Sequence, residues 1–320
     1  MSIALGIDTS NYTSSVAICK DGVVVGQKKM LLEVKKGQRG LRQSDAVFLH
    51  TVNLPQIMES LFKETDICYA QIDAVGYSAY PRDVAGSYMP CFLVGESAAR
   101  SLSAVGRWPV YPFSHQCGHI MAALYQSGFT SYHKNNFIAF HVSGGTTEIL
   151  FVKPDSERIF CIEKIGGTLD LNAGQIVDRI GTLLNQPFPC GARLEAMALE
   201  SMNSIPIGKL SVNGLFCNLS GIENQVQKRI AEGHLPNDIA AYTMEYLCRV
   251  FEALTCNVRN QYPNIPILYA GGVMSNKAFQ KRLSAFENSY FAKPGFSSDN
   301  AAGTALLAEY KYRTENLNPR

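Results

Sequence analysis

Two stretches of this chain share one pattern. Residues 5–19 read LGIDTSNYTSSVAIC and residues 140–152 read FHVSGGTTEILFV, so each places a tip of small residues between two apolar strands. Such a tip brings backbone N–H groups and hydroxyls close to a ligand, and phosphate is the usual one. Either stretch alone is better explained as an ordinary hairpin with a turn rich in Ser and Thr. Together with Gly271 and Gly272, which follow a third apolar run, they favour a duplicated domain that holds phosphate between its halves.

The order of the apolar segments also repeats. A strand–strand–strand–helix–strand–helix pattern precedes Gly128 and begins again after it, which predicts a duplicated ribonuclease-H-like α/β fold with two lobes. We expect the first lobe at 1–110 and the second at 111–299, with the last helix (300–315) returning to the first lobe. Residues 202–218 have little periodicity and predict an irregular insertion. The expected strands are 3–7, 14–19, 23–28, 72–78, 110–113, 137–142, 147–152, 158–163 and 265–270; the expected helices are 46–63, 92–105, 115–125, 171–184, 191–200, 219–232, 237–260, 275–286 and 300–313.

Composition limits the class of protein. The chain has 320 residues, 46% of them hydrophobic, which suits two folded domains and excludes a disordered protein. None of the apolar runs approaches the length of a membrane span, and the start MSIALGID lacks the basic region of a signal peptide. Nine cysteines without a C-x-x-C pair indicate free thiols. We therefore expect a cytoplasmic protein with no membrane attachment.

Charge is uneven along the chain. The formal net charge of +2 does not by itself indicate nucleic acid, but basic residues gather in segment 28–42. This segment is either a solvated loop or a surface for the phosphate backbone of RNA, in which case binding would depend steeply on salt. Its basic residues are Lys28, Lys29, Lys35, Lys36, Arg39 and Arg42.

Two histidines are spaced for a metal ion. His115 and His119 stand at i and i+4 of a predicted helix, so both imidazoles can reach one ion, whereas Cys117 points to the other side. A third ligand must come from elsewhere, and Asp299 is the best candidate. Two histidines and one carboxylate suit iron or zinc. The alternative is that one histidine packs in the helix and the other is exposed.

Several short motifs are candidates for a nucleotide site. Gly144 and Gly145 sit in a turn that could wrap a phosphate or simply close a hairpin. Asp178, in the middle of a predicted helix, could accept hydrogen bonds from ribose hydroxyls or could be a surface charge. Gly191 and the segment 271–276 are Gly-containing turns at helix N-termini, where a backbone can approach phosphate or adenine.

These motifs, in this order, resemble the TsaD-type proteins of the actin–hexokinase–sugar-kinase (ASKHA) superfamily, once described as O-sialoglycoprotein endopeptidases. The similarity extends over nearly the whole chain. The matching segments are Gly6-Ile7-Asp8-Thr9-Ser10, His115 with His119, Val142 to Thr147, Ala173-Gly174 with Asp178, Pro189 with Gly191, Leu219-Ser220-Gly221, Gly271 to Val273 with Asn276, and Ser298-Asp299-Asn300.

The resemblance implies a function and a site. Members of the family transfer a threonylcarbamoyl group from threonylcarbamoyl-AMP to N6 of the tRNA adenosine 3′ of the anticodon, and they work with partner proteins. It implies one divalent metal held by His115, His119 and Asp299. It further implies an ATP- or AMP-type adenine nucleotide or adenylate, contacted by Ser143, Gly144, Gly145, Asp178, Gly191 and Asn276.

The chain departs from the family at the other end of the site. Where the family has Cys-Asp-Glu-Thr after its opening motif, this chain has Asn11-Tyr12-Thr13-Ser14, so Tyr12 and Thr13 replace two acids. Asp8 is then a possible catalytic carboxylate, and the catalytic residues stay unassigned. The family's Gly-Pro-Gly is replaced by Tyr80-Pro81-Arg82-Asp83 with extra residues after it, and Ser44-Asp45 matches the family's Ser-Arg-x-His poorly.

Three functions therefore remain open. The chain is an active tRNA threonylcarbamoyltransferase, a divergent paralogue that carbamoylates another acceptor, or a non-catalytic nucleotide-binding partner subunit. The lost acids favour the last two, whereas the retained metal motif and segment 28–42 favour the first two. A zinc peptidase is the weakest reading, because no Glu follows the first histidine of the H-x-x-x-H motif.

Overall fold

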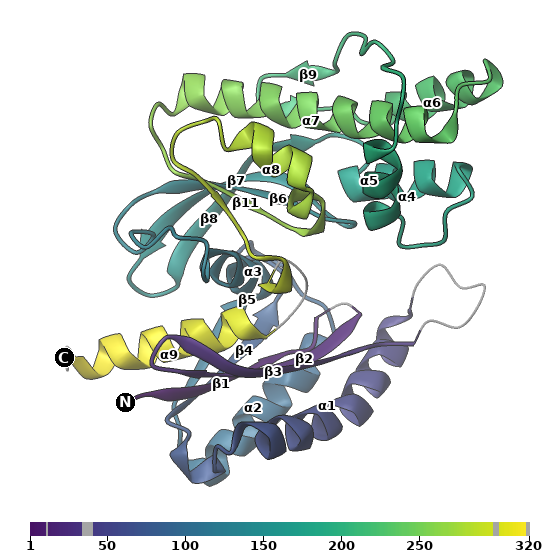
Figure 1. Cartoon of the computed structure of the whole chain (residues 1–320). Coiled ribbons are helices and arrows are strands. Elements are labelled where there is room, and N and C mark those ends of the chain that lie inside the picture. The colour runs from purple at the N-terminus through teal and green to yellow at the C-terminus, as the bar shows by residue number, and fades with distance from the viewer. Residues whose placement is uncertain (11, 34–40, 297–300, 318–320) are drawn as a thin grey trace. The chain divides into compact units, whose positions relative to one another are not determined.

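The computed structural model describes residues 1–10, 12–33, 41–296 and 301–317. The chain forms two compact units, which are shown in Figure 1 and are described separately below. Unit 1 comprises residues 1–126, 154–162 and 295–320, and unit 2 comprises residues 127–153 and 163–294. No helix of the described residues is long and apolar enough to cross a membrane.

Unit 1 is built on a five-stranded sheet of order β3-β2-β1-β4-β5. The first three strands form an antiparallel meander, and β4 and β5 extend it in parallel. Strand β1 is central and buried along its whole length, which explains its continuous apolar run. The bounds are β1 Ile3–Asp8, β2 Thr13–Lys20, β3 Val23–Leu31, β4 Ala74–Tyr80 and β5 Val110–Ser114.

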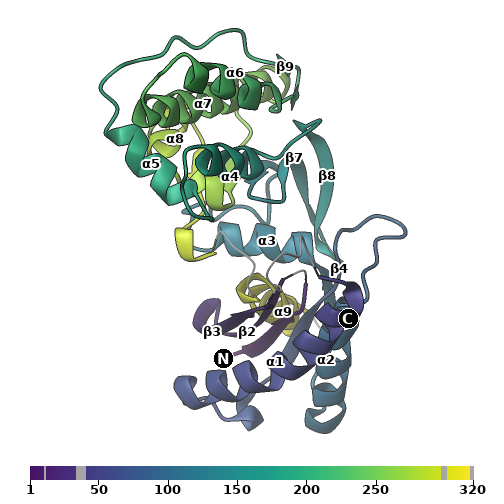
Figure 2. The same cartoon turned by 90° about the vertical axis from the view of Figure 1, so that its right-hand side faces the viewer.

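Helices cover both faces of this sheet. Helices α1 (Gln43–Thr65) and α2 (Phe92–Gly106) lie on one face, and the C-terminal helix α9 (Ala302–Leu317) lies on the other, against β1, β2 and β4 (Figures 1 and 2). Helix α3 (His115–Leu124) follows β5 and packs against α9. Short 3-10 turns occupy Tyr69–Gln71 (η1) and Pro294–Phe296 (η3).

Unit 2 holds a seven-stranded sheet of order β12-β11-β6-β7-β8-β10-β9. Strands β6 and β7 form an antiparallel hairpin, and β11 pairs with β6 in parallel. The bounds are β6 Phe137–Val142, β7 Thr147–Asp155, β8 Ile159–Thr168, β9 Val212–Asn213, β10 Phe216–Cys217, β11 Ile267–Ala270 and β12 Ser289–Phe291.

The core of unit 2 lies between one face of this sheet and its helices. Inward residues of β6 and β7, such as Phe140 and Ile149, are buried with apolar residues of the long helix α7. Phe251 and Leu254 of α7 are at most 1% exposed. The helices are α4 Ala173–Leu183, α5 Gly191–Leu199, α6 Gly221–Ala231, α7 Pro236–Gln261, η2 Gly272–Ser275 and α8 Lys277–Leu283.

The duplicated α/β fold is confirmed, since each unit begins with a three-stranded meander and continues with helices and parallel strands. The units divide after Gln126 rather than after residue 110, because β5 adds to the first sheet and α3 packs against α9. The segment 202–218 is less irregular than predicted. Its strands β9 and β10 are two residues each, too short to show a period of two in the sequence.

Candidate active site

The two predicted metal ligands face each other on helix α3. The Nε2 atoms of His115 and His119 are 2.8 Å apart, and their rings meet edge to face at 74°. Both residues are half-buried. The spacing of four residues places the two side chains on one side of the helix, as the sequence indicated.

The buried carboxylate of Asp8 contacts the ring nitrogen of His115 that does not face His119. Oδ2 of Asp8, at the end of β1, lies 2.8 Å from Nδ1 of His115. The same oxygen accepts a hydrogen bond from the Ser78 hydroxyl, and Oδ1 accepts one from the backbone N–H of Ser10. Burial by itself would raise the pKa of Asp8, but His115 and these hydrogen bonds hold the pKa well below its usual range. An ionised Asp8 can only accept a hydrogen bond from His115, so it takes the Nδ1–H and fixes the ring orientation that directs Nε2 toward His119.

The start of α3 is fixed by its cap. Ser114 accepts a hydrogen bond from the backbone N–H of Cys117 and donates one to Oδ2 of Asp83. Tyr80 donates to the other oxygen of Asp83 at 3.0 Å. Burial and the adjacent Asp83 raise the pKa of Tyr80 to about 12. The segment 80–83, which departs from the family pattern, is therefore hydrogen-bonded to the N-cap of α3.

A close helix crossing positions the same helix from the other side. Gly303 of α9 meets Gly118 of α3 so closely that an added Cβ would lie 1.8 Å from the carbonyl oxygen of Gly118. The hydroxyl of Thr304 lies against Gly118 as well. Only glycine permits this approach of two backbones.

The histidine pair fits a metal that takes imidazole ligands. Two Nε2 atoms converge, and a carboxylate orients one ring, as is common for metal-bound histidine. Cys117 is not part of this set, because its buried thiol is directed to the carbonyl of Arg158. Asp299, the third predicted ligand, lies outside the described residues. Within the described residues, no group of three His, Cys, Asp or Glu side chains is placed to hold a metal ion.

The second candidate site, in unit 2, is a turn of exposed backbone. Ser143 begins the β6–β7 turn, and its N–H donates to the carbonyl of Thr146 at 2.7 Å. Gly144 and Gly145 are exposed, and a Cβ added to either would meet nothing within 4 Å. Helix α4 begins directly against this turn, since a Cβ on Gly174 would lie 2.6 Å from Ser143 and Gly144 atoms. The tip is therefore open on one side and rigidly supported on the other.

Asp178 connects α4 to the start of α5. Its Oδ1 accepts a hydrogen bond from the backbone N–H of Cys190 at 2.9 Å, which places Gly191 beside α4. The Cys190 side chain fills the space left by Gly181, where a Cβ would be 2.3 Å away. Asp178 is thus half-buried and structurally engaged, whereas the adjacent Arg179 is exposed and pairs with Glu223.

Asn276 lies at the start of helix α8. Its Oδ1 caps α8 by accepting the N–H of Phe279 at 3.0 Å, and the side chain is 8% exposed. The preceding Gly271 has φ = 97°, and a Cβ there would lie 2.1 Å from the carbonyl oxygen of Val142. Such a conformation at this proximity requires glycine. Gly271 thereby brings the β11–η2 turn against the strand that leads into Ser143.

The structure thus brings the six predicted nucleotide residues of unit 2 into one neighbourhood made by four segments. The histidine pair belongs to unit 1. Tyr12 is 45% exposed, and Thr13 is buried at the start of β2. Lys28 pairs with Glu64 at 2.6 Å, whereas the middle of the basic segment, with Lys35, Lys36 and Arg39, lies outside the described residues.

The contacts of Asp8 and Asp83 were not predicted. Asp8 stood out only as a possible catalytic acid at the end of an apolar strand, and its partner is 107 residues away in the sequence. Asp83 had no signal beyond its departure from the family pattern. Neither partnership follows from local spacing, because each depends on how β1, β4 and α3 meet.

Comparison with known proteins agrees with this architecture. A family model described as tRNA N6-adenosine threonylcarbamoyltransferase (TsaD) matches residues 31–306. Relatives of that name include one from Lactiplantibacillus plantarum, 27% identical over 88% of this chain and 80% of the relative. Another, from Methanopyrus kandleri, is 27% identical over 94% of this chain and 85% of the relative.

Solved structures share the fold at low identity. HypF from T. kodakarensis matches with a TM-score of 0.62 and 12% identity, over 98% of this chain and 48% of that protein. Component A of the Acidaminococcus fermentans (R)-2-hydroxyglutaryl-CoA dehydratase matches with a TM-score of 0.58 and 16% identity, over 98% and 100%. Both likenesses extend over 98% of this chain and agree with the α/β fold predicted from the sequence. From the family model and these relatives, the chain belongs to the TsaD family of transferases, the tRNA N6-adenosine threonylcarbamoyltransferases.

Proposed function

We propose that this chain transfers a threonylcarbamoyl group from threonylcarbamoyl-AMP to N6 of the adenosine 3′ of the anticodon in tRNA. The observation that carries this proposal is the family match over residues 31–306. In the reaction, the N6 amine attacks the carbamoyl carbonyl carbon, the bond from that carbon to the phosphate oxygen breaks, and AMP leaves with the electron pair. The amine gives up one proton to solvent or to a base.

The glycine turn of unit 2 suits the adenylate. The exposed backbone of Gly144 and Gly145 can approach a phosphate without steric hindrance. Ser143 adds a hydroxyl, and the half-buried Asp178 offers a carboxylate for ribose hydroxyls. Gly191 and Asn276, at the starts of α5 and α8, complete the set that we assign to the nucleotide.

The histidine pair of unit 1 suits a divalent metal, iron or zinc. His115 and His119 would hold it through Nε2, and Asp299 would supply the third ligand. When bound, such a metal neutralises negative charge on phosphate or on a developing oxyanion. Asp8 accepts the Nδ1 proton of His115 and orients its ring, which leaves Nε2 as the atom that would bind the metal.

Partners and compartment follow from the same proposal. tRNA is the acceptor, and other proteins of the threonylcarbamoyl pathway act with this chain. All nine cysteines are free thiols, which is consistent with a reaction in the reducing cytoplasm.

A product assay tests the proposal. Unmodified tRNA would be incubated with this chain, threonylcarbamoyl-AMP and pathway proteins, beside an active TsaD-type enzyme as control. Nucleoside mass spectrometry should detect threonylcarbamoyladenosine above background. A working control with no product from this chain, in the presence of each pathway protein, would contradict the proposal.

A second candidate, carbamoylation of another acceptor, is favoured by one observation. Tyr12 and Thr13 replace two acids, and the nearby carboxylate, Asp8, already accepts hydrogen bonds on both oxygens. We therefore also propose a test of acceptor choice: restoring both acids with Tyr12→Asp and Thr13→Glu. A gain of tRNA product in this double variant, from an inactive parent, would favour the paralogue. An unchanged rate would favour a transferase that does not use these acids.

A further inference from the structure

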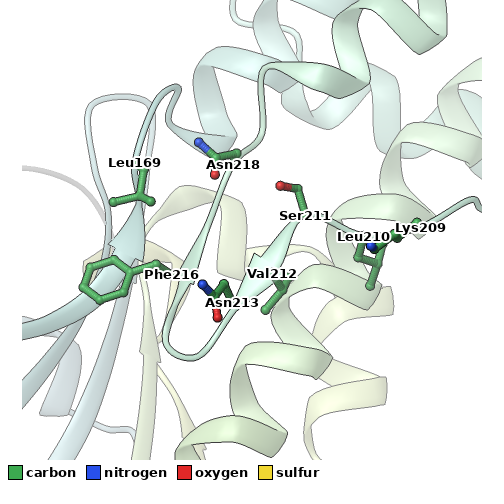
Figure 3. A pocket seen from close by; sticks show the side chains of 8 residues that line it. All are labelled: Leu169, Lys209, Leu210, Ser211, Val212, Asn213, Phe216 and Asn218. Carbon is green, nitrogen blue, oxygen red and sulfur yellow. The ribbon is translucent and has the colours of Figure 1, made fainter.

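Unit 2 has a pocket that lies apart from the residues assigned to the proposed transfer. It has a volume of about 520 Å³ and lies at the β10–β9 end of the sheet (Figure 3). In Figure 3, Leu169 and Phe216 stand at one end, Lys209 and Leu210 at the other, with polar side chains between them. The lining residues are Leu169, Lys209, Leu210, Ser211, Val212, Asn213, Phe216 and Asn218.

Strand register explains why Asn213, Phe216 and Asn218 share one face of the sheet. Phe216 pairs with Asn213 of β9 on one side and with Gly167 of β8 on the other. The pairing of the two strands continues past Phe216, because the N–H of Asn218 donates to the carbonyl of Ser211. Side chains alternate along a strand, so Cys217, between Phe216 and Asn218, points to the opposite face and is buried in the core.

The chemistry of this face suits a flat, polar-edged ring. Phe216 is 38% exposed and Leu169 is 65% exposed, so both offer apolar surface to a ligand. The amides of Asn213 and Asn218 carry both donors and acceptors, as does the Ser211 hydroxyl. An aromatic platform flanked by amides is how proteins bind unpaired bases.

Charge around the pocket agrees with a nucleotide. Lys209 is exposed and forms no ion pair within the described part of the chain, so it can contact a phosphate. Asp170 follows Leu169, but both its oxygens accept hydrogen bonds from the backbone or hydroxyl of residues 219–220. The negative charge of Asp170 is therefore partly offset by these protein donors, and Lys209 is the basic side chain that lines the pocket.

We propose that this pocket binds an unpaired base of the tRNA substrate, other than the adenosine that is modified. The inference rests on the proposed tRNA function. Phe216 stacks on the base, Asn213 and Asn218 contact its edge, and Lys209 contacts an adjacent phosphate. A protein segment added to the sheet edge is the competing occupant, but β9 spans only Val212–Asn213 and offers little edge for strand pairing.

RNA binding by the full chain tests the pocket directly. Fluorescence anisotropy would follow a labelled tRNA anticodon stem–loop and a fully paired RNA of equal length, with no threonylcarbamoyl donor present. We expect Phe216→Ala to weaken stem–loop binding roughly five- to hundred-fold, because loss of base–aromatic stacking has about that effect. Phe216→Tyr should stay within about twofold of wild type, since its ring still stacks. Binding of the paired RNA should not change.

Two further variants separate stacking from charge. Tyr69→Ala removes an aromatic ring of unit 1 that is 71% exposed, and it should leave binding unchanged. Lys209→Gln should lower the slope of log affinity against log salt by about one, as expected for one lost phosphate contact.

The outcomes distinguish the pocket from the transferase function. Equal stem–loop binding by wild type and Phe216→Ala overturns the pocket, even if the wild type makes threonylcarbamoyladenosine. Weakened binding by Phe216→Ala supports the pocket even if no product forms. A wild-type chain that binds neither RNA overturns the pocket as well.

Discussion

The two candidate sites use opposite means of preparing for a ligand. On α3, side chains are already oriented: His115 and His119 face each other, and Asp8 is buried with both oxygens engaged. At the β6–β7 turn, side chains are almost absent, and Gly144 and Gly145 leave backbone open to solvent. The first site depends on exact packing of elements distant in sequence. The second depends on the absence of side chains at Gly144 and Gly145, which leaves the backbone accessible.

This difference predicts different sensitivity to substitution. Changes behind the histidine helix should disturb the fold or the metal, since its supports are buried and tightly packed. Changes at the glycine tip should leave the fold intact and remove only the ligand, because an added side chain there has room in the protein.

The largest effect is expected where α9 crosses α3. Gly303→Ala places a methyl group 1.8 Å from the Gly118 carbonyl oxygen, so the helices must separate. We expect the free energy of unfolding to fall by about 3 kcal/mol, measured by urea denaturation. Alanine is intrinsically better than glycine in a helix, so an unchanged or higher stability would show that the crossing is not tight. Gly295→Ala, at an open position of the same unit, should have little effect.

The next effect concerns metal. Asp8→Asn keeps the size of the side chain but removes the charge that orients His115, and we expect metal affinity to fall about 10–100-fold. His119→Ala should abolish binding and serves as the reference. Competition with a chelator, followed by elemental analysis, measures both. Equal affinity in wild type and Asp8→Asn would show that His115 does not depend on this carboxylate, and metal retained by His119→Ala would refute the ligand assignment.

The third prediction concerns nucleotide binding, and here the fold should stay intact, unlike in the first prediction. Gly145→Val should leave stability near that of wild type and weaken AMP binding about tenfold or more, the range expected for losing one hydrogen bond to a charged group. Titration calorimetry measures the affinity. Gly208→Val, at another open glycine of unit 2, is the matched control and should bind AMP normally. Undiminished binding by Gly145→Val would remove the turn from the nucleotide site.

The smallest effect is on acid stability in unit 2. Burial tends to raise the pKa of Asp170, but hydrogen bonds from the Ser220 hydroxyl and the backbone of residues 219–220 and 171 hold it well below the usual range. Its stabilisation is therefore full above the unfolded pKa and lost as pH falls below it. We expect the wild type to lose stability between about pH 4 and pH 2 more steeply than Asp170→Asn. Thermal melts across this pH range measure the effect, and Asp45→Asn is the surface control. Parallel curves of melting temperature against pH for wild type and Asp170→Asn would contradict the expectation.

Much of the fold followed from periodicity. The meanders at 3–28 and 137–163 and the helix at 115–125 were predicted near their observed bounds, because continuous apolar runs and regular helical spacing leave few alternatives. The strands at 212–217 were missed because each has two residues and pairs only with the help of β8. The division after Gln126 arises because β5 and α3 join the first unit through contacts with β4 and α9, which no local pattern encodes.

The sequence by itself therefore determined the repeated architecture, the i and i+4 histidines, and the glycine tip, since each is written in spacing along one segment. The tertiary structure alone decided that Asp8 supports His115, that Asp178 holds the start of α5, and that Gly303 sets the distance between α9 and α3. These are contacts between segments 12 to 185 residues apart. Their energy arises from burial and hydrogen bonding that exist only after distant elements have packed.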